Sequence, residues 1–191
     1  MWLRRPRDGI IHPEVEIPEH RDFAVSSVKI LLRSFLEAAN TYNPYFVEWR
    51  ADQKPYQLSM AKQVGLSVPR TLITSLPEEA KAFYRYLRQQ GSDCIYKRIG
   101  TARRFDFGTR RFDEYALERV DSLRFAPVIL QERIASGANL RVAIAGGNVF
   151  PAEWRSDDED PVDIRDDECA SMWPTDLPEQ FRTPLLRLHQ A

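Results

Sequence analysis

The fold is decided by residues 128–156, VILQERIASGANLRVAIAGGNVFPAEWRS. Apolar and polar residues alternate over Leu140–Ala145 and again over Val149–Trp154, which predicts two strands of a sheet that is covered on one face. Gly146-Gly147-Asn148 joins the two strands, and its glycines supply the positive φ that a tight hairpin turn requires. The sequence therefore predicts an antiparallel hairpin in this stretch.

Three polar side chains stand out in this stretch. Gln131 and Glu132 directly follow Val128–Leu130, an apolar run that predicts a buried strand. Buried polar groups need hydrogen-bond partners, and the edge of a purine base would provide them. Arg141 lies at the start of an otherwise apolar strand, where its guanidinium needs a partner such as a phosphate or a carboxylate.

Helices and strands are predicted on both sides of this stretch. Apolar spacing and glycine or proline boundaries predict helices over 26–40, 54–64, 76–90, 113–121 and 177–189, and strands over 68–73 and 93–98. Ser75 is the expected N-cap of the helix over 76–90. This order favours an α+β protein, in which a small α/β lobe is followed by an antiparallel lobe with a cleft between them. The acidic stretch 156–168 is expected to be a solvated loop.

Composition argues against several classes of function. Lys and Arg number 27 and Asp and Glu number 28, so no overall field favours nucleic acid or a membrane surface. Cys94 and Cys169 have no metal-ligand spacing, which fits a reducing cytoplasm. No apolar run reaches membrane-spanning length. We expect a cytoplasmic protein that binds neither nucleic acid nor membrane, although the arginines and phenylalanines of 98–112 would suit either RNA or a phosphate-binding loop.

Two lysines are candidate phosphate ligands by their position. Lys54 begins the helix predicted over 54–64, and Lys97 lies near the end of a strand that leads into a glycine-containing loop. A lysine at a strand end that faces a cleft is a common point-charge partner for phosphate, but either one alone could equally be a surface lysine. The sequence has no P-loop motif, no Rossmann glycine motif and no serine or cysteine nucleophile motif near a histidine.

In this order the segments resemble the ATP-grasp superfamily. The resemblance is carried by KPYQLSMAKQVGLSVPRTLIT (54–74), the strand that ends in Tyr96-Lys97, residues 127–156 and VDIR (162–165). The branch that is most similar contains the ribosomal-protein glutamate ligases and the ligases that build microviridin-type graspetides. The resemblance implies an ATP-grasp core with a nucleotide cleft between its two lobes.

The same resemblance implies a set of residues that bind the cofactor, ATP. These cofactor-binding residues are Lys54, Lys97, Gln131, Glu132, Ile134 and Asp163. The two lysines would hold the phosphates, and the chain from Gln131 to Ile134 would line the adenine pocket. The catalytic residues would be Arg141, which faces the γ-phosphate, and Arg165, which with Asp163 positions phosphate or substrate.

The resemblance also implies the reaction. Its members activate a carboxylate with ATP as an acyl-phosphate, which an amine or a hydroxyl then attacks, and here the acceptor would be a peptide or protein. The family binds Mg²⁺ through an Asp and a Glu/Asn pair that follow later in the chain, and nothing after Leu177 supplies these ligands. We therefore expect no metal ligands in this chain.

The departures from the family predict a chain that is truncated at both ends. Residues 1–50 would be a remnant of the N-terminal region with a linker, 51–125 the central α/β lobe, and 126–191 an incomplete C-terminal lobe. We expect weak or no turnover from the chain alone. The alternatives are a non-catalytic remnant that binds nucleotide or peptide, and one half of a split ligase that pairs with a complementary chain or forms a homo-oligomer.

Overall fold

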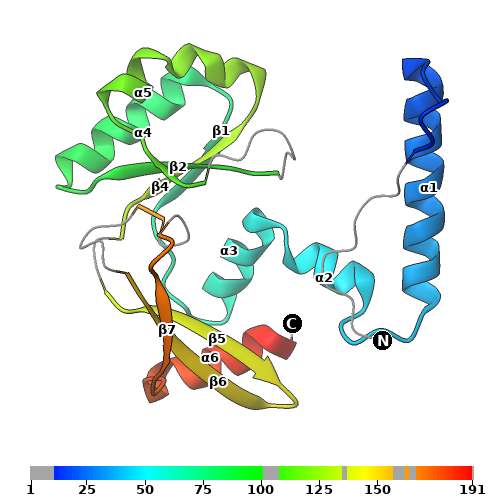
Figure 1. Ribbon diagram of the computed structural model, residues 1–191. Coiled ribbons are helices and arrows are strands. Elements are labelled where there is room, and N and C mark those ends of the chain that lie inside the picture. The colour runs from blue at the N-terminus through cyan, green and yellow to red at the C-terminus, as the bar shows by residue number, and fades with distance from the viewer. Residues whose placement is uncertain (1–10, 101–107, 135–136, 157–161, 164–166, 191) are drawn as a thin grey trace. The chain divides into compact units, whose positions relative to one another are not determined.

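The computed structural model describes residues 11–100, 108–134, 137–156, 162–163 and 167–190 (Figure 1). The chain divides into two compact units, Met1–Gln57 and Leu58–Ala191. The expected boundaries after residues 50 and 125, and the expected cleft between lobes, stay predictions.

The main described elements of the first unit are helices. Helix α1 covers Pro18–Ala38 and α2 covers Tyr45–Ala51, and the two helices pack against each other. Helix α3, Lys54–Gln63, begins in this unit and ends in the second. Helix α1 begins eight residues before the start predicted at residue 26, because Pro18 in the first turn and Glu19 beside it suit a helix N-terminus although they extend no apolar face.

A four-stranded antiparallel sheet forms the centre of the second unit. Its order is β1-β4-β2-β3, with bounds Thr71–Thr74, Val128–Glu132, Cys94–Arg98 and Arg110–Arg111. Strand β4 lies between β1 and β2, both of which precede it in the chain. Gln131 and Glu132, which we expected just after the strand, are its last two residues. Pairing with two neighbours extends the strand beyond its apolar run.

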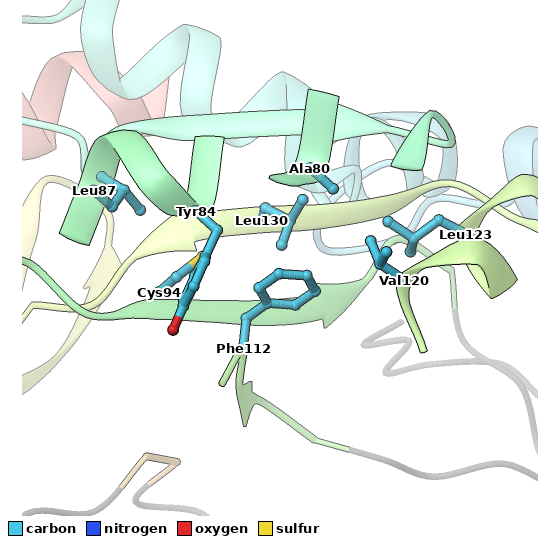
Figure 2. Close-up of a cluster of buried hydrophobic side chains, with 8 residues drawn as sticks. All are labelled: Ala80, Tyr84, Leu87, Cys94, Phe112, Val120, Leu123 and Leu130. Carbon is cyan, nitrogen blue, oxygen red and sulfur yellow. The ribbon is translucent and has the colours of Figure 1, made fainter. Parts of the chain in front are cut away.

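Helix α4, Pro77–Gln89, packs on one face of this sheet. The buried cluster between them contains Ala80, Tyr84, Leu87, Cys94, Phe112, Val120, Leu123 and Leu130 (Figure 2). Figure 2 shows the rings of Tyr84 and Phe112 facing each other within the cluster, with centroids 5.6 Å apart in an edge-to-face arrangement. These buried apolar side chains form one hydrophobic core between α4 and the sheet.

The start of α4 differs from our expectation. Leu76, not Ser75, is the N-cap, and no side chain caps the helix. The hydroxyl of Thr74 instead accepts a hydrogen bond from the Leu76 N–H (2.9 Å) and donates one to the Glu79 carboxylate. The predicted helix over 113–121 is shorter, because α5 covers Glu114–Glu118 and a 3₁₀ helix, Val120–Phe125, follows it.

A second antiparallel sheet contains the hairpin. Strand β5, Asn139–Ala145, pairs with β6, Asn148–Arg155, and β6 pairs with β7, Ser171–Pro174. The predicted hairpin is confirmed: Gly146 (φ 56°) and Gly147 (φ 80°) form its turn in the left-handed conformation that glycine adopts without strain. Strand β7 was not predicted, because its four residues show no clear alternation. Helix α6, Glu179–Gln190, contains Pro184.

Candidate functional site

A row of hydrogen-bonded polar side chains crosses three strands of the four-stranded sheet. Gln131 on β4 lies opposite Thr71 on β1 and opposite Ile95 on β2. Its Nε2 donates to Thr71 Oγ1 (2.9 Å), and its Oε1 accepts from Lys97 Nζ (2.8 Å). Gln131 is only 6% exposed, and both ends of its side-chain amide form hydrogen bonds within the sheet, as a buried amide requires. The structure therefore brings together Gln131 and Lys97, two of the predicted site residues.

The surroundings of this row are apolar. Residues two apart on a strand share a face, so Ile95 and Ile129 lie on the same face as Gln131 and Lys97. Both isoleucines are buried, whereas Lys97 is half-buried. The ammonium of lysine has three N–H donors, and Gln131 orients the group by accepting one of them. An oriented cation above an apolar sheet suits a ligand with an anionic part and a flat apolar part.

Glu132 points to the opposite face of the sheet. Arg70 binds its carboxylate through two hydrogen bonds, Nε to Oε2 (2.9 Å) and Nη2 to Oε1 (2.7 Å). The Ser92 hydroxyl donates a further bond to Oε1 (2.9 Å). These bonds lower the pKa of Glu132 to about 2, and the bonds from Arg70 have the largest effect. The structure thus separates the Glu132 side chain from the face that carries Gln131 and Lys97.

Arg141 lies on the exposed face of the hairpin sheet. It pairs with Ala152 in the register, while Asn139 pairs with Trp154, so Arg141 and Trp154 are diagonal neighbours on one face. The guanidinium carbon lies 5.0 Å from the centroid of the Trp154 ring. The aromatic ring supports the arginine by a cation–π contact, and the expected contact with a phosphate or carboxylate stays a prediction. Alternation along β5 places the arginine on the opposite face from the aliphatic residues beside it.

Asp163 contacts the edge of the four-stranded sheet. Its Oδ2 accepts a hydrogen bond from the backbone N–H of Thr109 (3.2 Å), a buried residue directly before β3. Tyr96 pairs with Arg110, so the same register continued by one residue brings Thr109 level with Lys97. The segment after β6 therefore reaches the strand that neighbours β2.

The remaining predicted residues lie elsewhere. Ile134 follows β4 and is exposed. Lys54 is the first residue of α3 and belongs to the unit Met1–Gln57, whereas the other predicted site residues belong to the unit Leu58–Ala191. Arg165 lies outside the described residues. Over the described ranges no three His, Cys, Asp or Glu side chains gather as a metal site requires. Nor does any helix there have the length and apolarity to cross a membrane.

Sequence reasoning missed three residues that support this arrangement. Arg70 and Thr71 were predicted only as part of the strand over 68–73, and Trp154 only as the end of a hairpin strand. Arg70 and its partner Glu132 are 62 positions apart, and no local pattern connects them. An arginine directly before a strand and a glutamate at the end of another are the only signals, and both are weak.

Comparison with solved structures identifies the fold. The macrocyclase MdnC of Microcystis aeruginosa MRC, bound with the precursor peptide MdnA, matches with a TM-score of 0.82 and 26% identity. A RiPP-associated ATP-grasp ligase of Chryseobacterium gregarium, in complex with ADP and a leader and core peptide, matches with a TM-score of 0.78 and 27% identity. The chain has an ATP-grasp fold. Each match covers 99% of this chain.

A third ATP-grasp structure extends the comparison. The ATP-grasp ligase PsnB, complexed with a phosphomimetic variant of a minimal precursor, Mg and ADP, has a TM-score of 0.69 at 26% identity over 88% of this chain. The ATP-grasp chain described here spans 61%, 60% and 52% of the lengths of MdnC, the Chryseobacterium ligase and PsnB. No protein-family profile and no curated protein matches the sequence. The predicted resemblance to peptide-modifying ATP-grasp ligases is confirmed by these structures.

Proposed function

We propose that this chain binds ATP on the sheet face that carries Lys97 and Gln131, and serves an ATP-dependent ligase reaction on a peptide. The observation that carries the proposal is the bond from Lys97 Nζ to Gln131 Oε1 (2.8 Å) within an ATP-grasp fold. The bond to the neutral amide of Gln131 orients the half-buried ammonium and brings no negative charge beside it. A phosphate group is the anion that the fold suggests.

The residues present fit a nucleotide. Ile95 and Ile129 make the sheet beside the pair apolar, and the chain from Gln131 to Ile134 offers amide and backbone groups to the polar edge of a base. Because the Glu132 side chain is bound by Arg70 on the other face, its contribution to an adenine pocket would come from its backbone. We propose that Asp163, which accepts a hydrogen bond from Thr109, also belongs to the nucleotide-binding set. The phosphate-binding role of Lys54 stays a prediction from the sequence.

Bound ATP would supply the phosphoryl group that activates a peptide carboxylate as an acyl-phosphate, for attack by an amine or a hydroxyl. Lys97 would neutralise negative charge on the transferring phosphate, and such electrostatic stabilisation accounts for most of the catalysis in phosphoryl transfer. Arg141, supported by Trp154, would present a guanidinium to the same group. Arg165 would share in positioning phosphate or substrate.

Unlike ATP, Mg²⁺ finds no set of ligands among the described residues. PsnB was solved with Mg and ADP, and Mg²⁺ prefers carboxylate and water oxygens in octahedral geometry. The residues described here do not fit such an ion, because their acidic side chains form no cluster. The proposed reaction therefore uses no Mg²⁺ ligand from the described residues, although the ion would accompany ATP.

The peptides bound in two of the similar structures support a peptide substrate. MdnC was solved with a precursor peptide, and the Chryseobacterium ligase with a leader and core peptide. We propose that the substrate is a peptide with a reactive carboxylate. The chain would act on it either alone or together with a complementary chain or a second copy of itself. A reducing compartment such as the cytoplasm suits its two cysteines, Cys94 and Cys169, which are free thiols.

Two assays test this function. Calorimetric titration of ATP with Mg²⁺ into the full chain should show saturable binding, and an assay for ADP release with a candidate precursor peptide should show turnover. Binding with turnover supports the ligase. Binding without turnover favours a non-catalytic nucleotide-binding protein, and the absence of any nucleotide binding would refute the proposal.

A further inference from the structure

The contacts of Arg70 join three separate segments. Its guanidinium bonds the Glu132 carboxylate twice, and also donates to Tyr86 Oη on α4 (3.2 Å) and to Ser92 Oγ just before β2 (3.4 Å). Its backbone carbonyl accepts from the Glu132 N–H (2.9 Å). The end of β4 is therefore fixed to β1 through both the backbone and the side chain of Arg70.

This fixed point lies one residue away from the candidate site. Gln131 and Glu132 are consecutive in β4, so their side chains leave the same length of backbone on opposite faces. On one face Glu132 is tied to Arg70 and Ser92, and on the other Gln131 is tied to Thr71 and Lys97. The end of β4 is thus held on one face by the residues that precede β1 and β2, and on the other face by residues within β1 and β2.

We propose that Arg70 is a positioning residue for the Lys97–Gln131 pair. By holding Glu132, it fixes the position and rotation of the last residues of β4, and so it aims the Gln131 amide at Lys97 Nζ. The consequence for nucleotide affinity rests on the proposed ATP site, but the effect on Gln131 does not. Arg70 itself lies on the opposite face and would contact no nucleotide.

The chemistry of the contact suits this role. A bidentate arginine–carboxylate contact fixes direction as well as distance, which a lysine at the same position could not do. The pair is partly shielded, with the side chain of Glu132 only 18% exposed and that of Arg70 38% exposed. The low pKa of Glu132, about 2, keeps its carboxylate ionised throughout the physiological range, so the contact does not switch with pH.

The test uses Arg70→Met, which keeps the length of the side chain and removes its fork. Arg88→Met is the matched control, because Arg88 forms an ion pair with Asp93 (2.5 Å) in the same unit but bonds no residue of β4 in the described contacts. The first readout is hydrogen exchange of the Gln131 side-chain amide in the ¹⁵N-labelled full chain. We expect exchange that is roughly tenfold faster in Arg70→Met and unchanged in Arg88→Met. Unchanged exchange in Arg70→Met would overturn the proposal.

The second readout is ATP affinity by calorimetry. Arg70→Met should weaken binding by roughly tenfold although Arg70 does not face the site, while Arg88→Met should leave it unchanged. The reversed pair, Arg70→Glu with Glu132→Arg, should recover part of the loss, which a nonspecific loss of stability would not do. Faster Gln131 exchange with unaltered affinity would support the positioning of Gln131 but overturn the proposed effect of Arg70 on ATP binding.

Two further outcomes remain decisive. If Arg70→Met does not fold, Arg70→Lys replaces it, since it keeps the charge but not the fork, and it should show the same changes to a smaller extent. If the wild-type chain binds no ATP, the proposed function fails, and the exchange of Gln131 still decides whether Arg70 positions it.

Discussion

Lys97 Nζ on β2 lies 2.8 Å from Oε1 of Gln131 on β4, and the other end of that amide is bonded to β1. The ammonium is therefore oriented by a side chain that is itself fixed and nine-tenths buried. A lysine whose ammonium is already oriented by a hydrogen bond loses less conformational entropy on binding an anion than a mobile surface lysine does.

Replacing Lys97 with alanine should weaken ATP binding. The loss should be about 1–3 kcal/mol, the usual effect of removing a charge-assisted hydrogen bond. Calorimetry of wild type and variant measures the change. Lys62→Ala, an exposed lysine in the last turn of α3, is the control and should bind as the wild type does. Equal affinity of Lys97→Ala and wild type would make Lys97 an ordinary surface lysine.

Replacing Gln131 with leucine should lower both stability and affinity. The apolar side chain fills the space but leaves Thr71 and Lys97 without the amide, so we expect a loss of about 1–2 kcal/mol in the free energy of unfolding. Urea denaturation gives the stability, and ATP titration of the folded variant gives the affinity. A variant that is destabilised but binds ATP normally would separate Gln131 from the site.

Trp154 should stabilise the orientation of Arg141. An exposed cation–π contact contributes about 0.5–1 kcal/mol, so a double-mutant cycle with Arg141→Ala and Trp154→Leu should show coupling of that size. The free energies of unfolding of the four proteins provide the measurement. Additive effects of the two substitutions would mean that the contact contributes nothing in solution.

Acid should remove the stabilisation that comes from Glu132. Its pKa falls from an ordinary 4.5 to about 2 in the folded chain, because Arg70 and Ser92 hydrogen-bond the ionised form. A carboxyl group with a lowered pKa stabilises the fold fully above pH 4.5, and this contribution disappears as the pH falls from about 4.5 to about 2.

The matched variant is Glu132→Gln. It should be less stable than the wild type at pH 7, by roughly 1–3 kcal/mol, and the difference should shrink as the pH falls toward 2. Urea midpoints measured across this range give the comparison. A difference that is constant with pH would show that the carboxylate is not the source of the stabilisation.

The two thiols should differ in reactivity. Burial raises the pKa of Cys94 to about 12, whereas Cys169 is exposed. In the native chain a thiol reagent should therefore modify Cys169 quickly and Cys94 only after denaturant is added. Cys169→Ser is the control and should leave a native protein without rapid reaction. Fast modification of Cys94 in that variant would mean that the core around it opens easily.

Local patterns predicted much of the fold. The hairpin turn at Gly146-Gly147 and the helices α3 and α4 follow from glycine conformation and from apolar spacing, which act over a few residues. Lys97 and Gln131 could be named as site residues because each lies near a strand end. That they bond each other depends on β2 and β4 pairing, and this pairing is a long-range property.

The features that the sequence did not predict also depend on long-range pairing. The opposite orientations of Gln131 and Glu132 follow only once both are known to lie within β4. The Arg70–Glu132 contact spans 62 positions, and neither residue belongs to a motif that suggests the other. Ser171–Pro174 is too short to show a strand pattern in the sequence. It is defined as strand β7 by its pairing with β6.

The most direct test of the central claim is an NMR titration of the ¹⁵N-labelled chain with ATP and Mg²⁺. We predict that the side-chain amide of Gln131 and the backbone amides of Lys97 and Ile129 shift together with a common affinity, while those of α4 on the opposite face change little. Saturable shifts confined to α4 and Ser92, or no shifts on the Gln131 face at saturating ATP, would contradict the account.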